Sequence, residues 1–124
     1  MYPTEKDNIV VWDGKTRGWY EVWYYKLNDP AAGTALWLRS TILVPFPGHG
    51  EPVGELWAIA FDKRDPAWNC AFKKTVTMRD VSLGRDSFSV AIAGATLTQT
   101  SSTGAIGEGQ GDGIAWDLAV LPSE

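Results

Sequence analysis

The sequence has little of the chemistry that most metal sites and many catalytic sites require, with one cysteine and one histidine among 124 residues. Because Cys70 is alone, an internal disulfide framework is excluded and a reducing compartment is expected. One histidine and one cysteine cannot supply a typical zinc or iron ligand set, so we expect no metal. His49 has no nucleophile motif near it and is expected to be an exposed loop residue. Cys70 alternates with Trp68 and Phe72, which favours a buried, inert thiol.

The chain also lacks runs of basic residues and long apolar runs. Its net charge is -4 and its pI is about 4.9, so the electrostatic signature of a nucleic-acid-binding protein is missing and we expect no nucleic-acid partner. The apolar runs are too short for a membrane span. Residues 1–8 are polar and unlike a signal peptide, so we expect a cytoplasmic protein. The length suits a single domain over residues 1–124.

Aromatic residues, in contrast, are abundant: the chain has seven Trp, four Tyr and four Phe. Such a number indicates an aromatic core, an aromatic-lined pocket or an adhesive surface. Alternation of apolar and polar residues predicts strands over 18–28, 34–44, 53–62, 68–78, 87–93, 97–106 and 114–121, with a short one over 8–12. Short turns separate these segments. The pattern predicts an all-β domain, an antiparallel barrel or strongly curved sandwich of roughly seven to nine strands.

A glycine-rich segment, 107–113, separates the last two predicted strands. We expect Asp112-Gly113 to form the hairpin turn. A calcium loop is a poor alternative, because the closing acidic position of an EF-hand would fall on Ala119 and no helices flank the segment.

The first three predicted strands can each be divided into two faces. If the turns preserve the alternation, one continuous face carries Glu21, Arg39 and Glu55 among aromatic rings. Charges among rings on a concave face are costly unless paired, so Arg39 between two carboxylates is a chemically reasonable arrangement. The opposite face is also largely apolar, which predicts that another domain, a second copy or the chain's own strands cover it. The charged face contains Trp19, Glu21, Trp23, Tyr25, Leu27, Ala35, Trp37, Arg39, Thr41, Leu43, Glu55, Trp57, Ile59 and Phe61.

This aromatic face has two interpretations. An alternating Trp and Leu face is often plain core, and the three charged residues form a structural ion-pair network equally well. Rings combined with a few convergent polar groups are, however, also the usual lining of a small-molecule site. The residues alone leave both interpretations open.

Short motifs in these strands resemble a known group of proteins. The motifs are EVWYY at 21–25, ALWLRST at 35–41, GELWAIAFD at 54–62 and IAWDL at 114–118. They resemble the first domain of the lipocalin-like superfamily of tocopherol cyclase and carotenoid 1,2-hydratase (hydroxyneurosporene synthase), to which lipocalin-like Diels–Alderases also look related. The likeness covers roughly residues 18–121.

The resemblance implies a lipocalin-like β-barrel and a terpenoid, carotenoid or polyketide-like ligand, with no redox cofactor. The enzymes of this group drive cyclisation, hydration or cycloaddition by protonation or by shaping a flexible chain. The resemblance further implies a neighbour, either a second copy in a homodimer or a second lipocalin-like domain. The positions that match its motifs are Glu21, Trp37, Arg39, Thr41, Glu55, Trp57, Phe61 and Trp116.

Three hypotheses follow. In the first, the protein is a cofactor-independent cyclase, hydratase or pericyclase in which Glu21 or Glu55 is the acid and Arg39 sets its protonation state. In the second, the same pocket carries an apolar molecule without turnover. In the third, the rings are core and the outer apolar face is an interaction surface; carbohydrate binding through exposed Trp is a further possibility. The candidate ligand-binding residues are Trp23, Tyr25, Trp37, Thr41, Trp57, Phe61 and Trp116.

Overall fold

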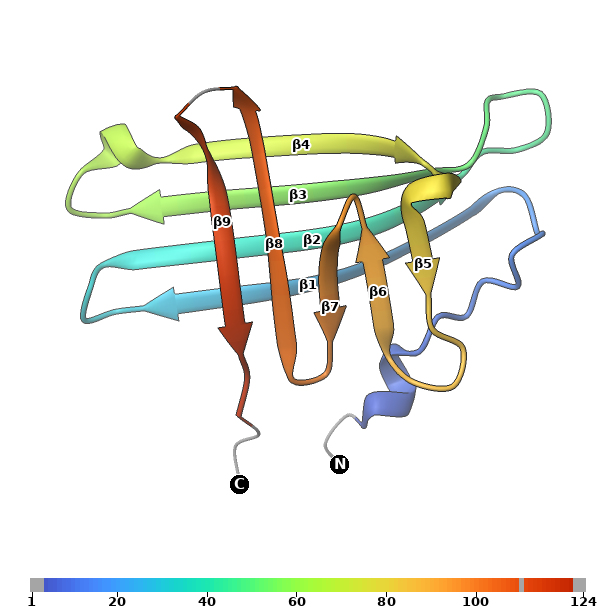
Figure 1. Ribbon diagram of the computed structural model, residues 1–124, viewed down its shortest axis with the longest axis horizontal. Helices are drawn as coiled ribbons and strands as arrows, with labels where there is room; N and C mark the ends of the chain where they lie inside the picture. Colours follow the sequence, from blue (N-terminus) through green and yellow to red (C-terminus); the bar gives the residue numbers. More distant parts are fainter. Residues whose placement is uncertain (1–3, 110, 122–124) are drawn as a thin grey trace.

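The computed structural model describes residues 4–109 and 111–121, which form nine strands in two antiparallel sheets (Figure 1). The first sheet contains β1 (Trp19–Asp29), β2 (Thr34–Val44), β3 (Val53–Asp62) and β4 (Cys70–Thr77) in that order. The second contains β5 (Val81–Leu83), β6 (Ser89–Ile92), β7 (Ala95–Thr98), β8 (Ser101–Gly109) and β9 (Asp112–Ala119). The strands of the two sheets cross steeply (Figure 1), as in orthogonal sheet packing.

The predicted all-β class is confirmed, and the strand number lies within the predicted range. No ladder joins the two sheets within the described residues, so they form a sandwich and not a closed barrel. The first three strands lie where the alternation predicts them, within one residue at each end. These segments are long and rich in aromatic and β-branched residues, which strongly favours strand.

Several predictions for the shorter elements are wrong. Residues 8–12 form no strand; a 3-10 helix, η1 (Glu5–Asn8), precedes an extended segment. The predicted strand 97–106 is divided between β7 and β8, and the alternation does not predict β5. Two more 3-10 helices, η2 (Pro66–Trp68) and η3 (Met78–Asp80), flank β4. Asp112 already pairs with Gly109, so the last turn comes before the predicted Asp112-Gly113 pair; position 110 within it lies outside the described residues.

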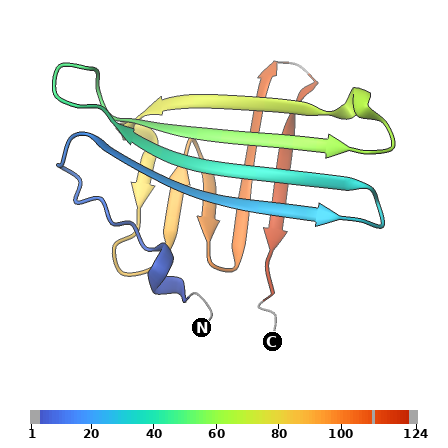
Figure 2. The ribbon, with the colours of Figure 1, turned by 180° about the vertical axis from the view of Figure 1, so that it is seen from behind.

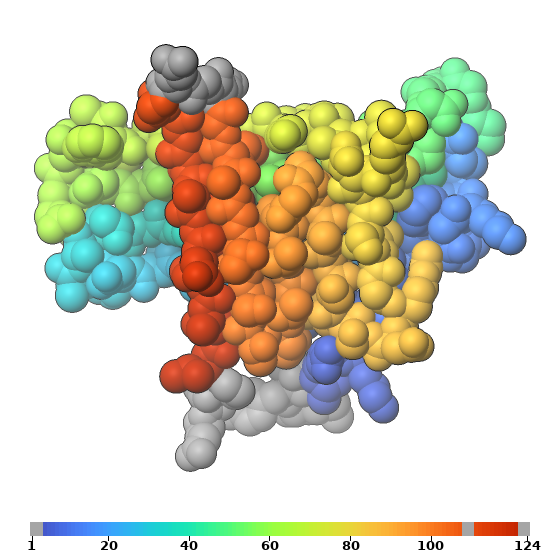
Figure 3. Space-filling view, viewed as in Figure 1, coloured from blue at the N-terminus to red at the C-terminus, as the bar shows by residue number. Residues whose placement is uncertain are grey.

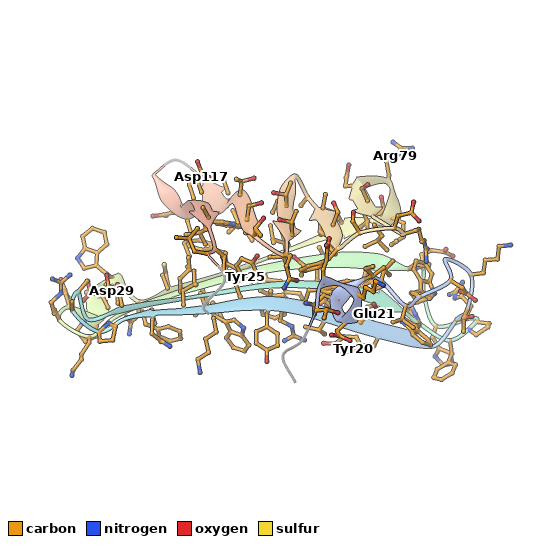
Figure 4. The ribbon with its side chains drawn as sticks, turned by 90° about the horizontal axis from the view of Figure 1, so that it is seen from below. Tyr20, Glu21, Tyr25, Asp29, Arg79 and Asp117 are labelled. Atoms are coloured by element: carbon orange, nitrogen blue, oxygen red, sulfur yellow. The ribbon has the colours of Figure 1, made fainter. Side chains whose placement is uncertain are left out.

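Strand pairing decides which side chains share a face, and it contradicts the predicted charged face. Tyr24 lies opposite Arg39 and Arg39 opposite Trp57, whereas Glu21 lies opposite Ile42. Glu21 therefore lies on the face of the first sheet that points toward the second sheet, the inner face. Arg39 and Glu55 lie on the other, outer face. Figure 4 shows the alternation in β1, with Tyr20 pointing away from the second sheet and Tyr25 toward it.

Glu21 and Arg39 lie on opposite faces because of the length of the turn between β1 and β2. Pro30 to Gly33 make a four-residue connection between the paired residues Asp29 and Thr34. An even number of connecting residues pairs odd positions of one strand with even positions of the next, because antiparallel partners run in opposite directions. Gly33 closes the turn with its N–H on the carbonyl of Asp29 (2.8 Å) at a positive φ of 70°, which suits glycine.

The space between the sheets is filled by side chains. The buried hydrophobic residues pack as one cluster, in which Trp23 and Trp116 are the large rings contributed by the strands. Trp116 Nε1 donates to Ser102 Oγ (3.0 Å), and this hydroxyl donates to the carbonyl of Thr96 (2.7 Å). The Tyr25 hydroxyl donates to the carbonyl of Thr98 and so ties the two sheets together. The cluster is completed by Trp12, Leu38, Ile42, Val44, Leu56, Ala58, Phe88, Val90, Ile92, Ala95, Leu97 and Ile106.

Candidate functional site: an apolar groove at the open end of the sandwich

The first sheet is longer than the second sheet is wide, and it extends beyond β9. Seen from either side, the β1–β2 and β3–β4 connections project past the edge of the second sheet (Figures 1 and 2). The space-filling view shows the same projection next to β9 (Figure 3). Between this projection and β9 lies a groove of about 520 Å³, called the end groove below.

Apolar side chains form most of the end groove. Leu27, Leu36 and Ala60 come from the inner face of the first sheet, and Ile114 and Leu118 come from β9. The complete lining is Leu27, Asn28, Asp29, Thr34, Ala35, Leu36, Ala60, Phe61, Asp62, Trp68, Ile114, Ala115 and Leu118. An open apolar groove with a few polar groups at its rim has the composition of a small-molecule site.

The polar rim of the groove is formed at the outer ends of β1 and β3. The backbone N–H groups of Arg64 and Asp65 donate to Asp62 Oδ1 (2.9 and 3.3 Å). These bonds hold the pKa of Asp62 below its ordinary value, and the bond from the Arg64 N–H has the largest effect. Asp29 Oδ1 accepts the N–H of Ala32 (3.1 Å). The rim of the groove therefore carries two carboxylates whose Oδ1 atoms already accept backbone N–H groups, and Trp68, which is 71% exposed, is part of the same lining.

Glu21, a predicted acid, is used as a hydrogen-bond acceptor for the N-terminal segment. Its Oε1 accepts the N–H of Trp12 (2.9 Å) and the indole N–H of Trp19 (2.8 Å), while Oε2 accepts the N–H of Val11 (2.9 Å). Trp12 is buried and donates its own indole N–H to the carbonyl of Thr16 (2.8 Å). The carboxylate therefore fixes the segment that carries Trp12 into the core.

The turn that follows Trp12 depends on a second carboxylate, Asp13. Its oxygens accept the hydroxyl of Thr16 (2.5 Å) and the N–H groups of Thr16 (2.6 Å) and Lys15 (2.8 Å). These bonds lower the pKa of Asp13 from 3.8 to about 2, and the bond from the Thr16 hydroxyl has the largest effect. The pKa of Asp13 is lower in the folded protein than in the unfolded chain. Ionised Asp13 therefore stabilises the fold above pH 3.8, and this stabilisation is lost as the pH falls toward 2.

We expect the amide signal of Thr16 in NMR spectra to titrate with a midpoint near pH 2. In Asp13→Asn this transition should disappear while the rest of the spectrum keeps its dispersion. A midpoint at the ordinary carboxyl value of 3.8 would contradict the hydrogen-bonded turn.

Arg39 and Glu55 lie on the outer face and are not paired with each other. Lys73 Nζ lies 2.7 Å from Glu55 Oε2 and 4.7 Å from the centroid of the Trp57 ring. Arg39 lies over the same ring, with Cζ at 5.7 Å, and donates to the Tyr20 hydroxyl. Trp57 therefore stands between two cations contributed by the neighbouring strands.

The predicted ligand-binding residues are distributed over three environments. Trp23 and Trp116 are core, and Tyr25 bonds the second sheet, where burial raises the pKa of its hydroxyl. Trp37, Thr41 and Trp57 belong to the outer face, with Thr41 fully buried beneath its neighbours. Of the predicted residues only Phe61 borders the end groove. The structure does not bring the predicted set together in one pocket.

Several residues of the groove were missed by sequence reasoning. Leu27, Leu36 and Ala60 look like ordinary inner-face residues near strand ends, and Leu118 like an ordinary strand residue. Nothing in the alternation distinguishes a covered leucine from one at an open end. His49 is exposed, as predicted, whereas Cys70 on β4 is only half-buried and not buried as predicted.

No family model, curated protein or solved structure matches the chain. Within residues 4–109 and 111–121, no group of three or more His, Cys, Asp or Glu is placed to hold a metal ion. None of the helices in the described ranges is long and apolar enough to cross a membrane.

Proposed function

We propose that this domain binds a bulky apolar small molecule of the terpenoid, carotenoid or polyketide-like class, and that the end groove is where it binds. One observation carries the proposal: a groove of about 520 Å³ lined by leucine, isoleucine and alanine side chains at the open end of the sandwich. The ligand class comes from the sequence resemblance. The interior between the sheets is a less suitable place, because the side chains of the core fill it.

Binding without turnover fits the positions of the charged residues better than acid catalysis. Glu21 already accepts three N–H groups, and protonating it would remove acceptors that hold the N-terminal segment. Glu55 is paired with Lys73 on the outer face, whereas the apolar walls of the groove belong to the inner face. Neither carboxyl is placed to deliver a proton to a molecule in the groove. A homodimer or a second lipocalin-like domain stays a prediction.

Replacing one of two alanines by phenylalanine, one inside the groove and one outside it, tests the groove as the binding site. Ala60 lies in the groove on the inner face, while Ala71 lies on the outer face of the adjacent strand β4. Ala60→Phe should weaken binding of geranylgeraniol about tenfold, since the larger side chain would occupy part of the groove, and tenfold corresponds to ~1.4 kcal/mol. Ala71→Phe should leave the affinity unchanged. Both are measured by titration of Trp emission, with urea unfolding as a check on the fold.

A second variant keeps the test decisive if Ala60→Phe is unstable. Trp68 is 71% exposed, so Trp68→Ala should preserve the fold and reduce both the emission response and the affinity. Equal affinities in the wild type, Ala60→Phe and Trp68→Ala would refute the groove as the site. So would the lack of any response to terpenoids, fatty acids and polyketides.

A further inference from the structure

The outer faces of the two sheets differ sharply in composition. The second sheet presents small and polar residues such as Ser89, Thr96, Thr103 and Asp117, and the Thr96 and Thr103 hydroxyls bond each other (2.8 Å). The first sheet presents rings and aliphatic side chains on all its long strands: Tyr20, Val22, Tyr24, Trp37, Leu43, Val53, Trp57, Ile59 and Phe61. No described element crosses this face (Figure 2). It is therefore an exposed apolar patch of the kind that marks an interaction surface.

The charge of this face is opposite in sign to that of the whole chain. Its cations are Lys26, Arg39 and Lys73, and its one carboxylate among the described strand residues is Glu55, which lies beside Lys73, so the face keeps an excess of positive charge. The chain as a whole has a net charge of -4. A surface of this kind attracts an anionic partner and repels a second copy of itself.

The lysines of this face favour a lipid surface over a protein. Lysine is depleted in the cores of protein interfaces. Trp and Tyr combined with Lys and Arg are instead the residues that anchor proteins at the boundary between headgroups and acyl chains. Here Tyr24 is 60% and Tyr20 52% exposed, and Phe61 and Leu43 stand exposed toward opposite ends of the face. Aromatic rings, exposed apolar side chains and cations thus lie together on the outer face of the first sheet.

The indole N–H groups of Trp37 and Trp57 add a second observation on the same surface. Both nitrogens are buried, and neither has a hydrogen-bond acceptor among the described residues. Tyr24 packs edge-on against Trp37 with ring centroids 6.2 Å apart, and Arg39 and Lys73 flank Trp57. A shift of these covering side chains would give the indoles access to the oxygen-rich headgroup region.

We propose that the outer face of the first sheet docks on the surface of an anionic lipid bilayer. The cations contact anionic headgroups, and Tyr20, Tyr24 and Phe61 enter the interfacial layer. Phe61 also borders the end groove, but the leucine and isoleucine walls of the groove come from the inner face and β9, and the cations and tyrosines of the outer face do not line it.

Two adjacent lysines of β4 provide a matched test. Lys73 lies on the outer face opposite Trp57, and Lys74 lies on the inner face opposite Leu56. We expect the wild type to sediment with vesicles of phosphatidylcholine and phosphatidylglycerol far more than with phosphatidylcholine alone, and less at high salt. Lys73→Gln should weaken binding about fivefold, and Lys26→Gln with Lys73→Gln roughly thirtyfold. Lys74→Gln should stay close to the wild type.

Tyr24→Ser tests the aromatic part and is expected to weaken binding without a change in fold, because this ring is largely exposed. Three outcomes would overturn the proposal. The first is equal binding to vesicles with and without phosphatidylglycerol, or no binding to either. The second is an equal loss in the Lys73 and Lys74 variants. The third is a dimer, seen by light scattering, that Tyr24→Ser dissociates and Lys74→Gln does not, because a second copy would then cover this face.

Discussion

Gly104→Ala is expected to lower the free energy of unfolding by about 3 kcal/mol, the upper end of the usual cost of overpacking a core. A Cβ at this position would lie 2.4 Å from Trp116 Cζ2 and 2.7 Å from the Cβ of Ala95. Trp116 cannot move away easily, because it is buried and its indole N–H is bonded to Ser102 Oγ. The backbone at Gly104 has no positive φ, so the effect is steric. Urea unfolding followed by Trp emission measures it.

A substitution at a second glycine, Gly48, measures the free-energy cost of backbone strain without a steric clash, for comparison with Gly104→Ala. Gly48 has a positive φ of 84°, and a Cβ at this position would meet nothing within 4 Å. Gly48→Ala should therefore cost only ~1 kcal/mol. In a Trp116→Leu background the cost of Gly104→Ala should fall markedly, which gives a coupling energy between the two sites. Equal costs of Gly104→Ala and Gly48→Ala, or no coupling to Trp116, would show that the core at this point yields without strain.

Glu21→Ala is expected to cost about 3 kcal/mol, because hydrogen bonds to a charged group contribute ~1.5–3 kcal/mol and their loss leaves donors unsatisfied. The variant removes the acceptor of the N–H groups of Val11 and Trp12 and of the Trp19 indole. Since Trp12 is buried, release of this segment also exposes core surface. The variant should unfold at lower urea concentration and be cleaved faster by proteases in the N-terminal segment.

Glu51→Ala is the matched control for Glu21→Ala. It removes the same charge from an exposed loop position and should change the stability by less than ~0.5 kcal/mol. Glu21→Gln keeps one acceptor oxygen and should fall between Glu21→Ala and the wild type. If Glu21→Ala were as stable as Glu51→Ala, the carboxylate would not anchor the segment, and the hypothesis that it is a catalytic acid would regain weight.

Much of the fold could be predicted because the long strands carry strong local signals. Residues 34–44 and 53–62 are rich in aromatic and aliphatic residues, and glycine or proline residues lie close to both ends of each segment, so their bounds agree with β2 and β3. Short strands carry less information: β5 has only three residues, too few for their alternation to identify a strand, and the turn that divides β7 from β8 contains neither glycine nor proline. Residues 9–12 are β-branched or aromatic, as in a strand, yet the Glu21 carboxylate accepts the backbone N–H groups of Val11 and Trp12, which therefore form no ladder.

The candidate site could be predicted only in part, because it depends on the relation between strands. Phe61 was found because it belongs to a motif, and it borders the groove. Leu27, Leu36 and Leu118 become groove residues only because the second sheet ends at β9 while the first continues. The offset between two crossed sheets results from packing across the core, which no single segment encodes.

By itself, the sequence determined that this protein is an aromatic-rich, acidic, all-β domain with one cysteine and one histidine, since composition and period-two alternation are properties of single segments. Only the tertiary structure decided where the rings go. A four-residue turn after Asp29 places Glu21 on the inner face and Arg39 on the outer face. Trp23 and Trp116 then belong to the core, and Trp37 and Trp57 to the outer face. The physical reason is that a one-residue change in register reverses every side chain of a strand, and register is fixed by turns and by pairing across the sheet.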